Sequence, residues 1–404
     1  MHLCNKYMTY FILPIINKNI TPDLIKLKFD DIDFKQKSIN PSLQKYLTYV
    51  KNLIGNNLYE WDNIKKYTNP YEFIHTPVPK FNLSVSKVKP ISRAFFKLIE
   101  IYNTFNIFQN MPTNINTFHL AEGPGGFIEA TTFIRKNNLL DNYYGISLIN
   151  NEDKKIPNWK KIDTLLKKYP NIHITYGADG TGDLYSSENL KYCIDNYKNS
   201  MEIITGDGGF DFSNNFNEQE SNAFRLILTQ VFYALSLQKF NGHFILKMFD
   251  LFTENSIQII YLLSCFYKKV IISKPNTSRR ANSEKYIICK NFKYTDTSFI
   301  NQKLVNIIKI LETLDFSKHK IVSVLDLPLQ YVYKNSIVEI NSFLGNLQIE
   351  NINTTIKLIN NKDKSDKLYN LKNSNINKCI KWCSKNYIQY NKIDNKQNIF
   401  LADK

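Results

Sequence analysis

The sequence predicts a doubly wound α/β fold of the Rossmann-like kind, with a mostly parallel sheet of seven strands. First, short apolar runs alternate with segments of helical periodicity from about residue 86 to residue 291. Second, the glycine-rich turn 123–127 stands directly between the first predicted strand and the next helix. Third, several apolar runs end at one charged residue, as buried parallel strands do at the carboxyl edge of a sheet. At that edge we expect a ligand site.

The composition allows a large core and favours a polyanionic partner. The chain has 404 residues, of which 43% are hydrophobic, and a formal net charge of +16. This length allows about two or three domains, and the positive charge favours nucleic acid. A biased genome is a second explanation, because Asn, Ile, Lys and Tyr are all abundant. Charge therefore supports a nucleic-acid partner without establishing one.

The cysteines and the apolar segments argue against two classes of protein. Only two of the six cysteines are close together, without a second pair or a histidine cluster, so we expect reduced thiols and no metal site. The apolar run at residues 8–16 is short, and no uninterrupted run reaches ~18 residues. We therefore expect a soluble, intracellular protein without a membrane partner. The cysteines are Cys4, Cys193, Cys265, Cys289, Cys379 and Cys383.

The first predicted elements of the sheet surround the glycine-rich turn. Residues 91–105 have apolar side chains at helical spacing, and Lys97 lies among them, where a lysine stem can extend along an apolar surface. A strand at 117–122 runs into the turn, and a helix begins near Ile128. Because glycine has no Cβ and helix-start N–H groups point at a ligand, backbone here can approach a nucleotide-like cofactor. The spacing is not GxGxxG, which argues against a dinucleotide.

Strand and helix signals continue to alternate after this turn. Strands are expected at 143–148 and 172–176, with a lysine-rich helix at 159–168 between them. The loop that follows contains Asp179 and Asp183, whose carboxylates suit the polar atoms of a nucleoside. A surface Asp-Gly turn is the alternative for this loop.

Three charged residues mark the ends of the later strands. Asp207 and Lys247 each follow an apolar run, and Glu284 precedes the last one. Arg279 and Arg280, in a strand-connecting loop, are candidates for contacts with backbone phosphates. The elements expected here are strands 202–205, 243–246, 270–273 and 286–289 and crossover helices 220–237 and 255–266.

Lys97, Asp207, Lys247 and Glu284 occur in this order among four longer motifs. The motifs are AEGPGGF (121–127), GDGGF (206–210), GHFILKMFDLFT (242–253) and KPNTSRRANSEKYIIC (274–289). In this arrangement, residues 92–290 resemble the FtsJ-like ribose 2′-O-methyltransferases with their Lys-Asp-Lys-Glu tetrad. Within that family the chain is most similar to the enzymes that methylate the first transcribed nucleotide of capped mRNA.

The resemblance implies S-adenosylmethionine as the cofactor and capped mRNA as the substrate, with other capping enzymes or a polymerase complex as further partners. Two positions depart from the family pattern: His119, where many members have an acidic residue, and Glu122, where a small residue is usual. The implied cofactor-binding residues are Ser92, Ala121, Glu122, Gly123, Pro124, Gly125, Gly126, Phe127, Asp183, Leu184 and Asp207. The implied substrate-binding residues are Asn217, Glu218, Gln219 and Asn282, beside the phosphate candidates Arg279 and Arg280.

The residue types of the tetrad also suit methyl transfer on chemical grounds. An in-line displacement requires alignment of the 2′-oxygen with the methyl carbon and a base for a weakly acidic proton. Lys247 can be that base only as a neutral amine. A second ammonium at Lys97 favours the neutral form, whereas the carboxylates of Asp207 and Glu284 orient the amines and favour the charged form. The four groups would therefore titrate as one coupled unit. A structural ion-pair network of the same residues is the alternative.

Other functions remain as alternatives to cap methylation. They are ribose methylation of rRNA or tRNA, a catalytically silent cap- or RNA-binding subunit, and a dinucleotide-dependent oxidoreductase. The oxidoreductase ranks last, because the sequence lacks the phosphate-binding fingerprint of that class. We expect an N-terminal extension at 1–85 with candidate RNA or cap contacts, a methyltransferase domain at 86–291, and a Lys- and Asn-rich, largely helical appendage at 292–404. A viral source would place the protein in host cytoplasm or the virion, and a cellular source in the nucleus.

Overall fold

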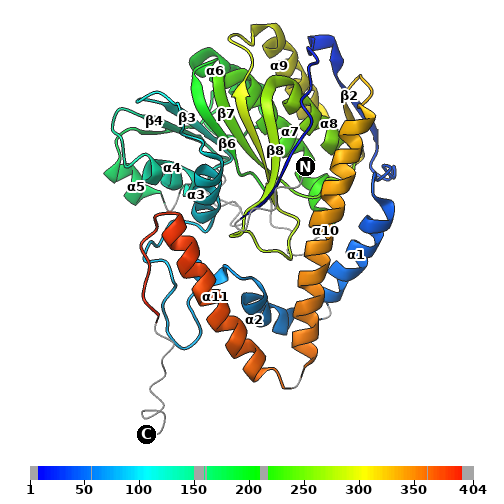
Figure 1. Cartoon of the computed structure of the whole chain (residues 1–404). Helices are drawn as coiled ribbons and strands as arrows, with labels where there is room; N and C mark the ends of the chain where they lie inside the picture. The colour runs from blue at the N-terminus through cyan, green and yellow to red at the C-terminus, as the bar shows by residue number, and fades with distance from the viewer. Residues whose placement is uncertain are drawn as a thin grey trace.

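A computed structural model describes residues 8–55, 57–149, 159, 162–209, 217–361 and 363–393. Its centre is an eight-stranded sheet with the order β1-β8-β9-β7-β6-β3-β4-β5 (Figure 1). The strands of this sheet are β1 (Thr9–Ile12), β3 (Asn116–Leu120), β4 (Asn142–Ile146), β5 (Ile172–Thr175), β6 (Met201–Gly206), β7 (Gln238–Met248), β8 (Tyr267–Lys274) and β9 (Lys285–Phe292).

The sheet confirms the predicted doubly wound, mostly parallel architecture. The strands from β5 through β4, β3 and β6 to β7 are parallel, whereas β9, β8 and β1 continue the sheet in antiparallel pairs. The predicted number of seven strands is one too low. Residues Thr9–Ile12 of the N-terminal extension add an eighth strand on β8 and thereby pair its otherwise free backbone groups.

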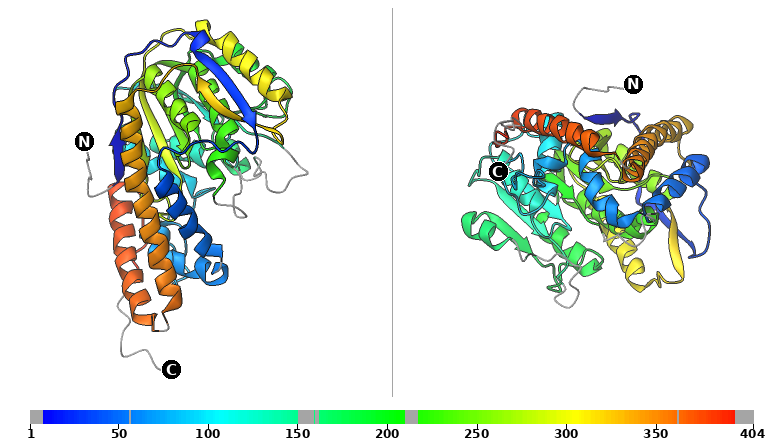
Figure 2. Two further views of the ribbon diagram at one scale, coloured as in Figure 1. Left: turned by 90° about the vertical axis from the view of Figure 1, so that its right-hand side faces the viewer. Right: turned by 90° about the horizontal axis from the view of Figure 1, so that it is seen from below.

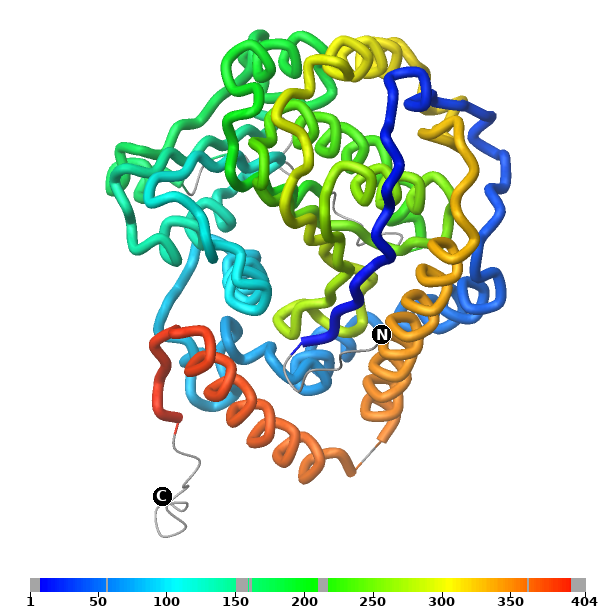
Figure 3. Tube along the Cα trace, turned by 45° about the horizontal axis from the view of Figure 1, so that its top comes forward, coloured from blue at the N-terminus to red at the C-terminus, as the bar shows by residue number. Residues whose placement is uncertain are grey.

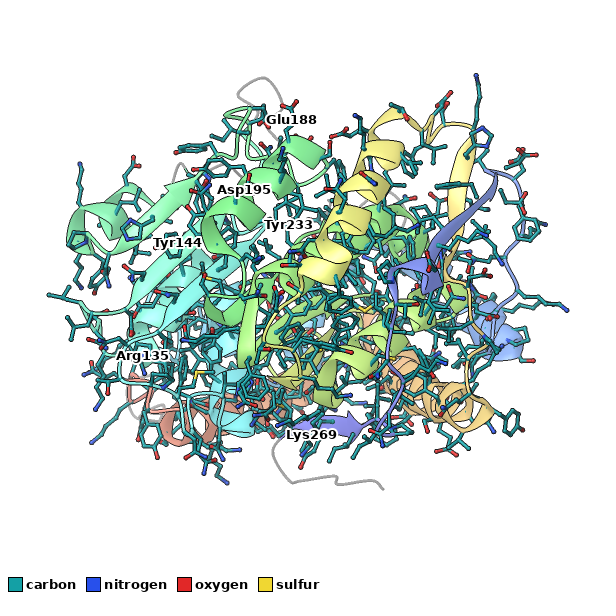
Figure 4. The ribbon with its side chains drawn as sticks, turned by 90° about the horizontal axis from the view of Figure 1, so that it is seen from above. Arg135, Tyr144, Glu188, Asp195, Tyr233 and Lys269 are labelled. Atoms are coloured by element: carbon teal, nitrogen blue, oxygen red, sulfur yellow. The ribbon has the colours of Figure 1, made fainter. Side chains whose placement is uncertain are left out.

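Helices cover both faces of the sheet. Adjacent residues of a strand point to opposite faces, so Ile203 packs in the apolar cluster that includes α3, whereas Ile204 packs in the cluster that includes α7 and α8. Helix α6 was not predicted from the sequence; its exposed Glu188 and Asp195 are labelled in Figure 4 together with the buried Tyr233 of α7. The helices of this part are α3 (Ala94–Phe105), α4 (Gly126–Ile134), α5 (Asp163–Lys168), α6 (Ser187–Tyr197), α7 (Gln219–Leu237) and α8 (Glu254–Phe266).

Described segments near the two ends of the chain pack against each other and against the central sheet. β2 (Ile25–Asp31) pairs antiparallel with β10 (His319–Leu325), as the left view of Figure 2 shows. In Figure 3 the N-terminal segment passes along the sheet towards α1, which lies beside α10. The C-terminal region is largely helical, and the three-part division of the chain stays a prediction. The helices at the two ends are α1 (Pro41–Gly55), α2 (Leu58–Thr68), α9 (Ser298–Thr313), α10 (Tyr331–Asn360) and α11 (Ser365–Lys385).

Within the described ranges, no helix is both long enough and apolar enough to cross a membrane. The same part of the chain contains no group of three or more His, Cys, Asp or Glu side chains with the arrangement of a metal site. Its five cysteines are buried free thiols, and burial raises the pKa of Cys193 to about 12.

Candidate active site at the carboxyl edge of the sheet

The strand topology brings the four predicted catalytic residues to one edge of the sheet. Parallel β6 and β7 are in register at Gly206 and Leu246, so Asp207 and Lys247 emerge side by side at their carboxyl ends. β9 runs in the opposite direction, and its first residues lie opposite Lys247. Glu284 directly precedes β9 and therefore reaches the same edge. Lys97 comes from the first half of α3, which packs on the face of the sheet that carries Ile203.

The four side chains form two ion pairs. Lys97 Nζ lies 2.7 Å from Glu284 Oε2, and both residues are 8% exposed. Lys247 Nζ lies 3.3 Å from Asp207 Oδ1 and also donates to the backbone carbonyl of Asp207 at 2.5 Å. The predicted tetrad is therefore assembled in space, although its catalytic role stays a prediction.

The charges of the tetrad act on one another through a poorly solvated region. Burial lowers the pKa of Lys97, because it disfavours the ammonium, while the carboxylates of Glu284 and Asp207 act in the opposite direction. Burial alone would raise the pKa of Glu284, but the ammonium groups of Lys97 and Lys247 hold it well below its usual range. The charges of Lys97 and Glu284 therefore stabilise each other, whereas titration of the whole tetrad as one coupled unit stays a prediction.

Tyr286 is a residue of this site that the sequence analysis missed. Its hydroxyl donates to Asp207 Oδ1 at 3.0 Å, and its ring is fully buried. Side chains two residues apart in a strand share a face of the sheet, so the spacing from Glu284 to Tyr286 was the available signal. Tyr286 fixes the orientation of the Asp207 carboxylate that Lys247 contacts.

The glycine-rich turn has the conformation that small residues permit. Ala121 has φ +51° and Gly125 has φ +108°, both in the left-handed region that favours glycine. Glu122 Oε1 accepts hydrogen bonds from the N–H groups of Phe127 at 2.6 Å and Ile128 at 3.2 Å. Two N–H groups at the start of α4, which we expected to point at a ligand, are thus bonded to Glu122. Burial, together with the charge of Asp207, raises the pKa of Glu122 well above its usual value.

Ser92 lies beside this turn and has an unsatisfied polar group. Its Oγ is buried and has no hydrogen-bond partner among the described residues. A Cβ added to Gly126 would come within 2.1 Å of this oxygen, so glycine is required for the close approach. An orphaned hydroxyl beside a glycine turn fits a polar ligand such as the methionine end of S-adenosylmethionine.

Two further cofactor candidates, Asp183 and Leu184, and His119, which departs from the family pattern, lie on neighbouring strands and loops. Leu184 is buried, and Asp183 Oδ1 accepts from the N–H of Tyr185 at 2.8 Å, while burial raises the pKa of Asp183. His119 is enclosed in the sheet, where its ring nitrogens lie 3.0 Å from Thr117 Oγ1 and 2.8 Å from Thr205 Oγ1. Burial lowers the pKa of His119 to about 3, so the imidazole enclosed in the sheet is neutral.

Three of the substrate candidates belong to the segment before and at the start of α7. Asn217 Nδ2 donates to Asn52 Oδ1 of α1 at 2.9 Å, and Glu218, which is exposed, directly precedes α7. Gln219 is buried and accepts a hydrogen bond from the hydroxyl of Ser283, next to Glu284. This contact joins the start of α7 to the loop between β8 and β9.

The other substrate candidates lie in the loop between β8 and β9. Arg279 Nε donates to Glu72 Oε2 at 3.0 Å, and a second hydrogen bond makes the ion pair bidentate. Arg279 therefore has a protein partner that the sequence did not reveal, whereas Arg280 is exposed. Asn282 Oδ1 accepts from Lys274 Nζ at 2.8 Å.

Comparison with known proteins agrees with this arrangement. A family model described as FtsJ-like methyltransferase matches residues 90–292, which is half of the chain. The "Cap-specific mRNA (nucleoside-2'-O-)-methyltransferase 1" of Homo sapiens is 36% identical over 179 residues, covering 43% of this chain and 21% of that protein. The protein of the same name from Danio rerio is 29% identical over 288 residues, covering 66% and 33%. The chain thus spans at most a third of the length of these two relatives. The fold, the assembled edge of the sheet and the match over residues 90–292 together show that the chain belongs to the FtsJ-like methyltransferase family.

Proposed function

We propose that the protein is an S-adenosylmethionine-dependent RNA ribose 2′-O-methyltransferase that acts on the first transcribed nucleotide of capped mRNA. The observation that carries this proposal is the convergence of two lysines and two carboxylates beside the glycine-rich turn. The names of the relatives support a capped mRNA as the substrate. A structural ion-pair network would explain the charges but not their location at the ligand-binding edge of the sheet.

In this proposal Lys247 is the base that accepts the proton of the ribose 2′-hydroxyl. A neutral amine keeps two N–H groups, which can donate to the carboxylate and carbonyl of Asp207, and leaves its lone pair free for the proton. Lys97 acts on Lys247 as a neighbouring positive charge and is itself held by Glu284. When bound, S-adenosylmethionine supplies an electrophilic methyl group.

The cofactor would lie along the turn 121–127, with Ser92 at its methionine end and Asp183 and Leu184 at its adenine. The orphaned Ser92 Oγ is the structural feature that supports this assignment. Asp207 would contribute to both the cofactor site and the tetrad.

The RNA would approach from the side of the loop between β8 and β9. Asn282 and the exposed Arg280 are the candidates in this loop, and Asn217, Glu218 and Gln219 are the candidates before and at the start of α7. Because Asn217 contacts Asn52 of α1, the N-terminal extension would contribute to this surface. Arg279 would contact phosphate only through the N–H groups of its guanidinium that Glu72 does not bind.

The test is transfer of a labelled methyl group from S-adenosylmethionine to one short RNA in three forms. The forms are uncapped RNA, RNA with an N7-methylated cap, and capped RNA already 2′-O-methylated on its first nucleotide. We expect transfer to the second form alone. Equal transfer to uncapped RNA would favour rRNA or tRNA as the substrate, and binding of capped RNA without transfer to any form would favour a silent subunit.

A further inference from the structure

The loop between β8 and β9, residues 275–284, is held at its beginning by a buried carboxylate. Glu100 lies on α3, one turn after Lys97, and is 3% exposed. Its two oxygens accept four hydrogen bonds, from the N–H and side-chain amide of Asn276 at 3.1 and 2.9 Å and from the N–H and hydroxyl of Thr277 at 3.1 and 3.0 Å. The helix that supplies Lys97 therefore also fixes the start of the loop that supplies Glu284.

The end of the same loop is held by Lys274, the last residue of β8. Its Nζ donates to the carbonyl of Asn282 at 2.8 Å, to Asn282 Oδ1 at 2.8 Å and to the carbonyl of Glu284 at 2.7 Å. These acceptors use all three N–H groups of an ammonium. One side chain thus contacts both an RNA-contact candidate and the backbone of a tetrad member.

Glu284 is also fixed through its side chain. Oε1 accepts from Ser278 Oγ at 2.7 Å, and Oε2 accepts from Lys97 Nζ at 2.7 Å. Both carboxylate oxygens therefore have partners, and the backbone of Glu284 is bonded to Lys274. Movement of this side chain out of its position would break its hydrogen bonds with Ser278 and Lys97.

A lysine at position 274 requires an explanation, because burial of an ammonium is costly. Lys274 is 8% exposed; burial lowers its pKa, whereas the charge of Glu284 and three oxygen acceptors favour the ammonium. The hydrogen bonds of the Lys274 ammonium all go to two residues of one loop, so the side chain contributes to the conformation of that loop rather than to contact between distant parts of the fold.

We propose that Lys274 is a positioning residue that fixes Asn282 and Glu284 relative to each other, so that the RNA contact and the tetrad are aligned together. The inference rests on the proposed function, because it assigns Lys274 a part in methyl transfer. Lys274 does not touch the reacting atoms in this assignment and acts through its two neighbours.

Lys293 provides a matched control at the opposite end of the same strand pair. It follows β9, and its Nζ donates to three backbone carbonyls, of Ile16 at 3.0 Å, Ser264 at 3.2 Å and Cys265 at 3.0 Å. Burial lowers the pKa of Lys293 as well. Lys274→Met and Lys293→Met therefore remove the same kind of interaction, near the tetrad and far from it.

The experiment compares both variants of the full chain in transfer to RNA with an N7-methylated cap, in S-adenosylmethionine binding by calorimetry, and in hydrogen exchange of residues 276–284. For Lys274→Met we expect kcat to fall by about tenfold to a hundredfold, the KM for RNA to rise, cofactor affinity to stay within about twofold, and exchange in the loop to accelerate. For Lys293→Met we expect a lower Tm with kcat and KM unchanged. Lys274→Gln keeps two N–H donors, so its kcat, KM and loop exchange should lie between those of the wild type and Lys274→Met. It replaces the methionine variant in the comparison if that variant does not fold.

Equal effects of the two methionine variants on kcat, KM and loop exchange would overturn the proposal, because Lys274 would then be structural only. Failure of the proposed function looks different, since the wild-type protein itself would transfer no methyl group. Loop exchange then decides alone: acceleration confined to the Lys274 variants supports the positioning role, and unchanged exchange refutes it.

Discussion

The two lysine–carboxylate pairs of the site differ in what holds them. Lys97 and Glu284 join helix α3 to the loop between β8 and β9, at 2.7 Å, with side chains 10% and 11% exposed. Lys247 and Asp207 come from neighbouring parallel strands, at 3.3 Å, with side chains 12% and 17% exposed. The first pair depends on tertiary packing, whereas the second follows from strand register alone.

This difference assigns different tasks to the two pairs. Both oxygens of Glu284 accept hydrogen bonds from protein groups, so the protein holds the carboxylate of the first pair at both oxygens. Lys247 and Asp207 are slightly more exposed, and Lys247 contacts both the carboxylate and the backbone carbonyl of Asp207. Under the proposed function, Lys247 therefore performs the proton transfer, and the first pair sets the charge and shape of its surroundings.

The substitution Lys247→Ala tests the reactive pair and should have the largest effect. Removal of a general base costs about 10²- to 10⁴-fold in turnover. Cofactor affinity, measured by calorimetry, should change little, because the hydrogen bonds of Lys247 go to Asp207 and it acts on the turn 121–127 only through the charge of Glu122. Wild-type turnover in the folded variant would exclude Lys247 as the base.

The substitution Lys97→Met tests the supporting pair through stability as well as turnover. It leaves the Glu284 carboxylate buried without its ammonium partner, which typically costs about 3–5 kcal/mol. We expect this loss in urea unfolding, together with reduced transfer.

A double variant separates the two effects of Lys97. Lys97→Met combined with Glu284→Leu removes both charges, so it should regain much of the stability but none of the transfer. If the double variant recovered transfer as well, the first pair would have no electrostatic part in the reaction.

The pH dependence of stability sharpens the contrast further. The folded pKa of Glu284 is lowered from its ordinary value of 4.5 by Lys97 and Lys247, which outweigh burial, so the ionised carboxylate stabilises the fold above about pH 4.5. That contribution is lost as the pH falls below 4.5, because the unfolded chain takes up the proton first. Glu284→Gln should therefore lower the free energy of unfolding by about 1–3 kcal/mol near pH 7, with a smaller difference at pH 3. A difference that grew towards low pH would contradict the ion pair.

Much of the site could be predicted because its signals are local in the sequence. Asp207 and Lys247 each follow a short apolar run. The glycine-rich turn and the motif around Glu284 can each be recognised from a few consecutive residues. Strand pairing then brings these local signals together without further information.

The long-range contacts could not be predicted in this way. Arg279 was predicted as a candidate for phosphate contacts, but its partner Glu72 lies 207 residues earlier in the chain. The bonds of Glu100 to Asn276 likewise join residues 176 positions apart. Strand β2 did have a local signal, since Ile25, Leu27 and Phe29 alternate with charged residues, but its partner β10 lies near the other end of the chain.

Tyr286→Phe is the mildest test of the comparison, because it alters the reactive pair without removing a charge. The substitution deletes the hydrogen bond from the buried hydroxyl to Asp207 Oδ1 and leaves the ring packing unchanged. A hydrogen bond to a charged group contributes about 1.5–3 kcal/mol, of which we expect only part to appear in the reaction, as a decrease of about tenfold in kcat with little change in the KM for RNA. Steady-state transfer to RNA with an N7-methylated cap measures both constants. A decrease as large as that of Lys247→Ala would mean that the orientation of Asp207, rather than the amine it holds, limits the reaction.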